Sequence, residues 1–323
     1  MKYKVITILF LCLVNLYGQD KLRIGVLAYG TVNWELNVLK YNKLDNKNGF
    51  DLEVVELASK NAQAVALQSG DVDIIVTDWI WVNSQRASGK DFTFYPYSKS
   101  IGTLNITANS KAKTLLDLKD KHLGIAGGVY DKSWLLYRAY CKRKYNIDLK
   151  NVVTPLYASA PILYQKMLDD SIEASINFWH FNAMLEPKGV KPLVDVDELL
   201  SGLELDKDVS FVGWTFNRNF ALKNKQLINS FLDATLQSKK ILNSDNQEWN
   251  RIRKDMNASD DETFEALKTG YKKGIIKEFS QQNIDNLAKV FKILLEEGGS
   301  NFVGESISLK DETFWKYTPK LDW

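Results

Sequence analysis

Four short segments combine aromatic, acidic and glycine residues, and each of them follows an apolar run. They are residues 29–34, 77–81, 127–134 and 177–180. Tryptophan rings can stack on a ring or enclose a cation, and the carboxylates of Asp78 and Asp131 can accept hydrogen bonds from an amine. Gly127 and Gly128 precede a helix, whose first N–H groups suit a carboxylate or sulfonate. These residue types favour binding of a small organic molecule with a donor end and an acceptor end.

The side chains expected to contact such a molecule come from these segments and from two crossover strands between lobes. They are Tyr29, Thr31, Asn33, Trp34, Asp78, Trp79, Trp81, Ser100, Gly102, Gly128, Tyr130, Asp131, Trp134, Asn177, Trp179, His180 and Trp214. Single members also have ordinary structural explanations. Any one tryptophan can be a core residue, and Asp131 can cap the helix expected over 132–145. Their clustering at strand ends favours a site for the group.

The sequence carries little that predicts catalysis. His122 and His180 are the two histidines, and their spacing is not that of a metal site. No Gly-x-Ser-x-Gly nucleophile elbow and no phosphate-binding lysine loop is present. We therefore expect a binding protein rather than an enzyme, with no metal and no cofactor. An enzyme that uses His180 and Asp78 as a base is an alternative.

Two halves of the chain repeat one pattern at an offset of 100 residues. Leu22–Tyr29 corresponds to His122–Gly128, Gly70–Trp79 to Asp170–Trp179, Trp34 to Trp134, and Trp79 to Trp179. Each half has a β-α-β-α-β order, which predicts a parallel sheet with helices on both faces. Ligands of such sheets bind beyond the carboxyl ends of the strands. The expected fold is therefore α/β, with two similar lobes and a cleft between them.

Segments 92–106 and 209–216 are extended, and we interpret them as the crossovers between the lobes. Lobe 1 is then expected over 20–102 and 217–323, and lobe 2 over 103–216. From Lys225 onward the apolar spacing is helical, and these helices are expected to pack on lobe 1. Ser100, Gly102 and Trp214 would form the floor of the cleft.

The first residues resemble a secretory signal peptide. Lys2 and Lys4 precede an apolar run over 5–14, and Gly18 follows as a small residue near a cleavage point. That run is about half of the roughly 20 residues that a spanning helix needs. Residues 1–18 are therefore expected to be removed, with an uncleaved anchor as the alternative. One cysteine, Cys141, then remains, so no intrachain disulfide is expected.

The chain resembles the type 2 periplasmic solute-binding proteins of ABC importers, within the nitrate, sulfonate, taurine and thiamine-precursor group. The residues that carry the resemblance are Lys21–Gly25, Gly70–Asp73, Leu115–Lys121 leading into Leu123–Ile125, and Tyr271–Ile275. The resemblance covers nearly all of residues 20–310. Asp78 with Trp79 and Trp81 departs from a simple inorganic-anion pocket and favours an aromatic, heterocyclic or amine-bearing solute.

The resemblance implies a periplasmic monomer that closes on its solute and delivers it to a membrane permease with an ATPase. The net charge of +2 favours no nucleic-acid partner. A carboxylate or sulfonate on the solute is compatible with the Gly127-Gly128 turn. A periplasmic accessory protein that hands a substrate or cofactor to a partner dehydrogenase is a further alternative.

Overall fold

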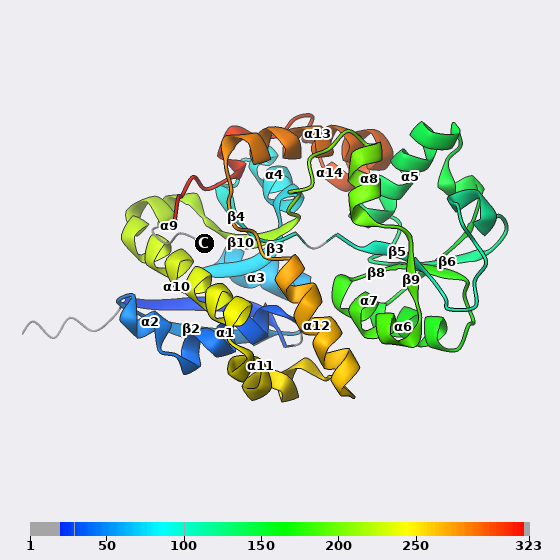
Figure 1. Ribbon diagram of the computed structural model, residues 1–323. Helices are drawn as coiled ribbons and strands as arrows, with labels where there is room; N and C mark the ends of the chain where they lie inside the picture. Colours follow the sequence, from blue (N-terminus) through cyan, green and yellow to red (C-terminus); the bar gives the residue numbers. More distant parts are fainter. Residues whose placement is uncertain (1–19, 29, 100, 320–323) are drawn as a thin grey trace, which may run out of the picture.

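Two five-stranded sheets form the centres of two lobes (Figure 1). The computed structural model describes residues 20–28, 30–99 and 101–319, and the predicted signal segment 1–18 lies outside them. The first sheet contains β1 (Asp20–Leu27), β2 (Phe50–Leu57), β3 (Ile74–Asp78), β4 (Phe92–Ser98) and β10 (Val212–Asn217). The second contains β5 (Thr103–Ile106), β6 (His122–Ala126), β7 (Thr154–Ala158), β8 (Ala174–Asn177) and β9 (Lys191–Val194).

Helices cover both faces of each sheet. Before β10 they are α1 (Val32–Tyr41), α2 (Leu44–Lys47), α3 (Lys60–Ser69), α4 (Trp79–Ala87), α5 (Lys132–Tyr145), α6 (Ala160–Leu168), α7 (Trp179–Leu185) and α8 (Val196–Gly202). The remainder are α9 (Arg218–Lys223), α10 (Lys225–Ser244), α11 (Asn246–Ile252), α12 (Asp261–Lys273), α13 (Gln281–Gly298) and α14 (Ser300–Val303). Short 3₁₀ turns are η1 (Leu115–Leu118), η2 (Leu149–Asn151), η3 (Glu186–Lys188), η4 (Arg253–Met256) and η5 (Asp311–Thr313).

The two sheets have the same plan, which confirms the internal repeat. Their orders are β2-β1-β3-β10-β4 and β7-β6-β8-β5-β9. In each sheet the first three strands are parallel, and the next one is antiparallel to both of its neighbours. The second sheet is therefore built from consecutive strands, whereas the first sheet includes β10, which follows all the strands of lobe 2 in the sequence. Because β10 belongs to the first sheet, the chain returns to lobe 1 before Val212 rather than at residue 217.

The repeat extends to close packing at matched glycines. A Cβ on Gly25 in β1 would lie 2.9 Å from the Leu57 side chain. A Cβ on Gly124 in β6 would lie 2.6 Å from Leu163 and 2.8 Å from Ile172. In both of these inner strands a glycine therefore stands where neighbouring side chains approach the backbone closely.

The C-terminal helices do not all pack on lobe 1, contrary to the expectation from the apolar spacing. The long helix α10 packs on α1 of lobe 1, but α12 packs on α7 and α13 packs on α5, both in lobe 2. Figure 1 shows α12 running between the two lobes. One core cluster joins Trp79 of lobe 1, Leu135 of lobe 2 and Phe291 of α13. The C-terminal segment therefore bridges the lobes.

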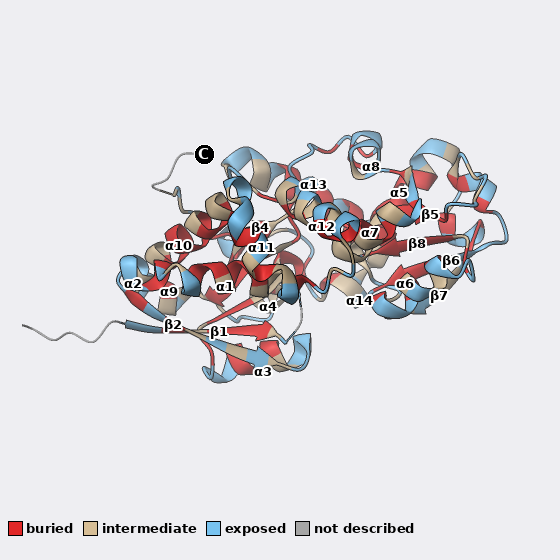
Figure 2. Ribbon diagram, turned by 60° about the horizontal axis from the view of Figure 1, so that its bottom comes forward, coloured by how far each residue is buried: buried red, intermediate tan, exposed pale blue. Residues whose placement is uncertain are grey.

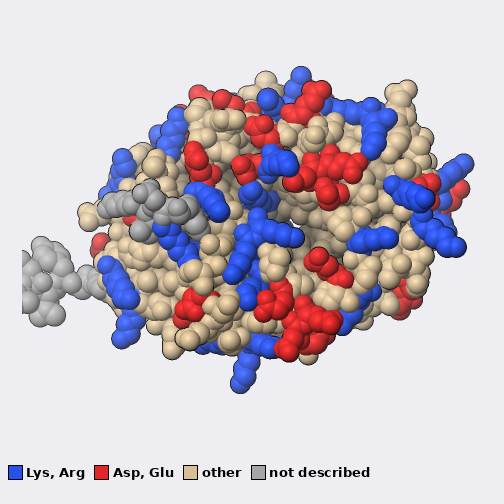
Figure 3. Space-filling view, viewed as in Figure 1, with Lys and Arg blue, Asp and Glu red and all other residues tan. Residues whose placement is uncertain are grey.

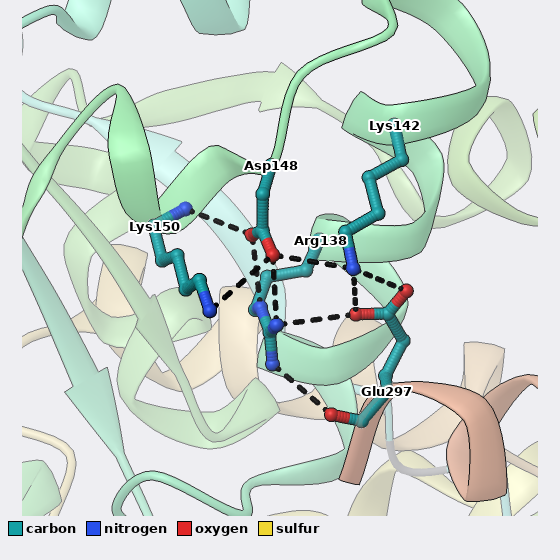
Figure 4. Close-up of polar contacts among 5 residues, drawn as sticks. All are labelled: Arg138, Lys142, Asp148, Lys150 and Glu297. Atoms are coloured by element: carbon teal, nitrogen blue, oxygen red, sulfur yellow. Dashed lines mark hydrogen bonds and ion pairs between the residues drawn. The ribbon is translucent and has the colours of Figure 1, made fainter.

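An ion network fastens α13 to lobe 2 (Figure 4). Arg138 on α5 pairs with Asp148 at 2.8 Å and with Glu297 on α13 at 3.3 Å. Lys142, one helical turn beyond Arg138, pairs with the same two acids at 3.2 and 2.7 Å. The side chains of Arg138, Asp148 and Glu297 are each about nine-tenths buried.

Buried residues concentrate on the strands and on the helix faces that meet them (Figure 2). Apolar side chains such as Leu22, Ile24, Ile74 and Ile125 are fully buried. Their burial is the main favourable contribution to folding. Across the described residues, none of the helices combines the length and apolar character needed to span a membrane.

Candidate functional site

A cavity of about 550 Å³ lies between the two lobes beside the first crossover. Lobe 1 and the C-terminal helices line it with Thr31, Tyr97, Lys239, Tyr271 and Lys273, and lobe 2 lines it with Asn105, Trp179, Asn182 and Glu186. Lys99 and Ile101 of the crossover complete this wall. The face drawn in Figure 3 is hollowed between the lobes, with basic and acidic side chains around the hollow.

A buried ion pair lies on the lobe 1 side of this cavity. Glu35 is fully buried on α1 and accepts hydrogen bonds from the Lys239 ammonium and, at 2.8 Å, from the Tyr271 hydroxyl. The same ammonium lies 3.7 Å from the centre of the Tyr97 ring. Burial raises the pKa of Glu35, against the attraction of Lys239, and burial lowers the pKa of Lys239. Helices α1, α10 and α12 are thereby held around one charged centre.

The lobe 2 side presents buried amides with unused acceptors. Asn182 donates its Nδ2 hydrogens to the carbonyls of Thr103 at 3.2 Å and Asn177 at 3.1 Å, which orients its Oδ1. Neither this Oδ1 nor that of Asn105 has a hydrogen-bond partner among the described residues. Asn105 is 5% exposed and Asn182 is 7% exposed. An unsatisfied buried acceptor costs about 1–3 kcal/mol, so these amides suit donors brought by a solute.

Charged side chains stand at the cavity wall nearer to solvent. Lys99 pairs with Asp208 at 2.5 Å, and Lys207 pairs with Asp197 at 2.9 Å. Lys273 on α12 forms no ion pair within the described part of the chain, and it is exposed. The cavity therefore combines buried amides on one side with an uncommitted ammonium group on the other.

Of the residues expected from sequence, Thr31 and Trp179 line this cavity. The ring of Trp179 stands edge-on to Trp34, with the ring centres 6.1 Å apart. A Cβ on Gly270 of α12 would lie 2.9 Å from the Trp179 ring, so a glycine is required there for the helices to meet. Tyr29 and Ser100 lie outside the described residues.

Four of the expected tryptophans, Trp34, Trp79, Trp134 and Trp214, are core residues in this arrangement. Trp79 is fully buried, stacks on Phe211 with ring centres 6.2 Å apart, and donates to the Ser210 carbonyl at 2.8 Å. Trp134 and Trp214 are each 1% exposed. Trp214 belongs to β10, so it packs inside lobe 1 rather than on the floor of a cleft. These rings contact protein and not the cavity.

Other expected residues make contacts within the protein. Trp34 donates to the Asp255 carbonyl, Asn33 to the Leu27 carbonyl, Asn177 to the Ala160 carbonyl, and the Gly102 N–H to the Ser133 hydroxyl. Trp81 packs on Phe92, and Tyr130 stacks on Phe302. His180 packs against Phe181, and burial lowers its pKa to about 4, so its imidazole is neutral at pH 7. No hydrogen bond joins His180 to Asp78 in the described part of the chain.

The two expected acids are helix caps. The Asp78 carboxylate accepts from the Trp81 N–H at 2.9 Å, and Asp131 accepts from the Trp134 N–H at 3.0 Å. Asp78 also pairs with Lys132 at 3.1 Å. Gly128, at a φ of +86°, belongs to the turn that leads to Asp131. Among the described residues, no three His, Cys, Asp or Glu side chains gather where they would hold a metal.

Several residues that line the cavity or lie directly behind its wall were not expected from sequence, although some leave a recognisable pattern. Glu35 is an acid on the apolar face of a helix, and Lys239 lies on the buried side of α10. Asn105 is a polar residue between Leu104 and Ile106 in a buried strand. A buried polar residue requires a hydrogen-bond or ion-pair partner. A polar residue on the apolar face of a predicted helix or strand is therefore the sequence feature that indicates such a contact.

Solved structures with the same arrangement match nearly the whole chain. The periplasmic aliphatic sulphonate binding protein SsuA from Escherichia coli matches with a TM-score of 0.71, at 18% identity, over 93% of each chain. The alkanesulfonate-binding protein SsuA from Xanthomonas axonopodis pv. citri, bound to MOPS, matches with a TM-score of 0.66, at 17% identity, over 92% of this chain and 98% of that one.

The fold is the type 2 periplasmic binding protein fold. This confirms the expected α/β architecture of two lobes, two crossovers and a helical C-terminus. The binding-protein fold is also similar to that of a cysteine-to-serine mutant of DszB in complex with biphenyl-2-sulfinic acid, with a TM-score of 0.61 at 13% identity over 94% and 97% of the chains. No family model matches this sequence, and no curated protein matches it.

Proposed function

We propose that this protein is the solute-binding component of an ABC importer. It acts in the periplasm as a monomer, holds a small organic solute in the cavity between its lobes, and presents it to a membrane permease that works with an ATPase. The observation that carries this proposal is the interlobe cavity, in which the buried amides of Asn105 and Asn182 face Lys239, Tyr271 and Lys273.

The cavity favours an organic anion that also carries hydrogen-bond donors. Its volume of about 550 Å³ lies within the range of about 300–1,000 Å³ for small-molecule sites. The free acceptors of Asn105 and Asn182 suit an amine, amide or hydroxyl group, and Lys273 suits a carboxylate or sulfonate. Trp179 supplies an apolar part of the cavity wall. The sulfonate ligands of the similar SsuA proteins agree with an anionic group.

Solute binding drives closure of the lobes only through a difference in affinity between the open and closed forms. Asn105 and Asn182 belong to lobe 2, and Lys273 belongs to α12, which also contacts lobe 1 through Tyr271 and Glu35. A solute that reaches both sides makes its full set of contacts only when the lobes are together. The closed form is then the one that the permease receives.

Replacing Trp179 or Asn105 with alanine is expected to weaken solute binding. Loss of the apolar contact of Trp179 removes about 1.5–3 kcal/mol, and loss of the Asn105 hydrogen bond removes about 0.5–1.5 kcal/mol. Native mass spectrometry of the freshly purified protein identifies the co-purified solute. Calorimetry with that solute, and with short sulfonates and carboxylates that do or do not carry an amino group, measures the affinities.

Tyr157→Ala is the matched control, because Tyr157 is an exposed aromatic residue on β7, at the edge of the lobe 2 sheet. This variant is expected to bind as the unchanged protein does. Equal affinities for the unchanged protein, Trp179→Ala and Asn105→Ala would remove the cavity from the proposed function.

The likeness to DszB makes an enzyme the second candidate function. In this chain the neutral His180 lies among aromatic rings, and the buried Cys141 has its pKa raised to about 11 by burial, so neither group is prepared as a base or nucleophile. We therefore expect the bound solute to be recovered chemically unchanged after prolonged incubation. Appearance of a product would favour the enzyme.

A further inference from the structure

A second group of charges joins the lobes outside the cavity. Asp78 stands at the carboxyl end of β3 in lobe 1, and Asp131 and Lys132 stand at the start of α5 in lobe 2. The Lys132 ammonium lies 3.1 Å from Asp78 Oδ2. The side chains of Lys132 and Asp78 are 19% and 22% exposed. This ion pair therefore connects the strand ends of the two lobes in a partly buried position.

The geometry of the pair is fixed on its acidic side. Asp78 Oδ1 accepts the Trp81 N–H at 2.9 Å and so caps α4. That bond holds the carboxylate in place, and its second oxygen faces lobe 2, where Lys132 meets it. The carboxylate thus presents a preorganised acceptor to the Lys132 ammonium group.

The N-terminus of α5, where an external anion could bind, is also occupied by a side chain of this protein. A Cβ on Gly127 would lie 2.8 Å from Asp131 Oδ2, so the turn before α5 wraps closely around this carboxylate. Gly127 has a φ of +93°, which a side chain would strain. The Asp131 carboxylate therefore occupies the N-terminus of α5, which would otherwise suit an external anion. Lys132 forms its ion pair with Asp78 of the opposite lobe.

The surrounding charges support the pair. Burial acts to raise the pKa of Asp78, but Lys132 and the Trp81 N–H outweigh it, and the pKa is lowered overall. Burial acts to lower the pKa of Lys132, but Asp78 and Asp131 raise it overall. Repulsion from Lys132 lowers the pKa of Lys60, at the start of α3. At neutral pH both members of the pair are charged.

We propose that Asp78 is a binding site for a primary ammonium group, and that this chain fills it with its own Lys132 and thereby ties the two lobes together without solute. A free amine is then excluded from the strand ends, and solutes are directed to the cavity beside the crossover. The ammonium site does not depend on which solute the cavity takes.

The test follows lobe separation by single-molecule fluorescence transfer in the unliganded protein. Dyes are attached through Val65→Cys in lobe 1 and Ile162→Cys in lobe 2, both of which are exposed positions, whereas Cys141 is buried. Lys132→Ala is expected to raise the ratio of open to closed molecules roughly tenfold, within the usual range for coupling between two sites. Asp78→Asn is expected to do the same, because asparagine keeps the cap and loses only the charge.

Butylammonium chloride is the probe, because butylamine has the same four-carbon chain and primary amine as the complete lysine side chain. Its addition is expected to restore the closed population of Lys132→Ala and to leave Asp78→Asn open. Sodium chloride at equal ionic strength is expected to have no such effect. Lys21→Ala is the matched control, since it breaks the exposed Lys21–Glu53 pair inside lobe 1.

Each outcome bears on the proposal. An unchanged population in both Lys132→Ala and Asp78→Asn would overturn it. The proposal would also be overturned if butylammonium restored the closed population equally in Lys132→Ala and in Asp78→Asn. Asp78→Asn changes neither the size of a side chain nor the cap, so it decides the matter even where Lys132→Ala folds poorly. Failure of the cavity to bind any organic anion would reject the proposed function and leave this result intact.

Discussion

Replacing Glu35 with alanine is expected to destabilise the protein by about 3–5 kcal/mol, because it leaves the Lys239 ammonium buried without a counter-charge. Glu35 is fully buried and accepts from both Lys239 and Tyr271, so α1, α10 and α12 lose a common contact. Urea unfolding followed by circular dichroism measures the change. A loss below about 1 kcal/mol would contradict the view that this pair holds the cavity wall.

Lys239→Met is expected to give a different pH dependence. A buried Glu35 without its partner has its pKa raised further by burial, because Lys239 is the group that opposes that rise. A raised folded-state pKa means that the stability is present below the ordinary value of 4.5 and is lost as pH rises through the folded value. The variant should therefore be more stable at about pH 5 than at about pH 8. A flat profile between these pH values would argue against a raised pKa of Glu35 in the folded variant.

The second large effect is expected at Arg138, in the network between α5 and α13 (Figure 4). Arg138→Met leaves two buried acids, Asp148 and Glu297, with Lys142 as their nearest remaining partner. Loss of one member of a buried ion pair costs about 3–5 kcal/mol. Arg143→Met on the same helix is the control, since Arg143 is 45% exposed and reaches Glu204 only at 3.9 Å. Similar losses in both variants would contradict a special role for the network.

Arg138→Met should also change how the stability of the protein depends on pH under acidic conditions. Burial acts to raise the pKa of Asp148, but Arg138, Lys142 and the Lys150 N–H outweigh it and lower the pKa to about 2. A lowered folded-state pKa gives stability that is present above the ordinary value of 3.8 and is lost as pH falls toward 2. Without Arg138 the folded value rises, so the contribution of Asp148 is smaller across this range. Thermal unfolding between about pH 2 and pH 6 measures the difference.

The fold was largely predictable because its main determinants are local. The helix expected over 132–145 has the bounds of α5, since Asp131 caps its start and the chain turns at Asn146. The repeat at an offset of 100 residues predicted two equivalent sheets. Apolar periodicity and caps depend on nearby residues, and such features can be read before the tertiary structure is known.

The site was less predictable because distant segments decide which way a side chain faces. Trp79 follows a strand end, as a ligand residue would, but Phe291 and Phe314 from the C-terminal segment cover its ring. Lys239 and Tyr271 reach the cavity from α10 and α12, which are far beyond α1 in the chain. Asp78 ends a strand as expected, but its partner is Lys132 of the same chain.

The insertion of β10 between β3 and β4 has a consequence for how the chain acquires its structure. The gap between β3 and β4 in the first sheet is filled by β10, and no described residue before Val212 closes it. A ribosome-bound fragment that ends before β10 therefore contains the whole lobe 2 sheet but an incomplete first sheet. Pairing between distant segments slows folding. The N-terminal half should thus remain open during synthesis, and the lobe made second should be the first to become resistant to protease.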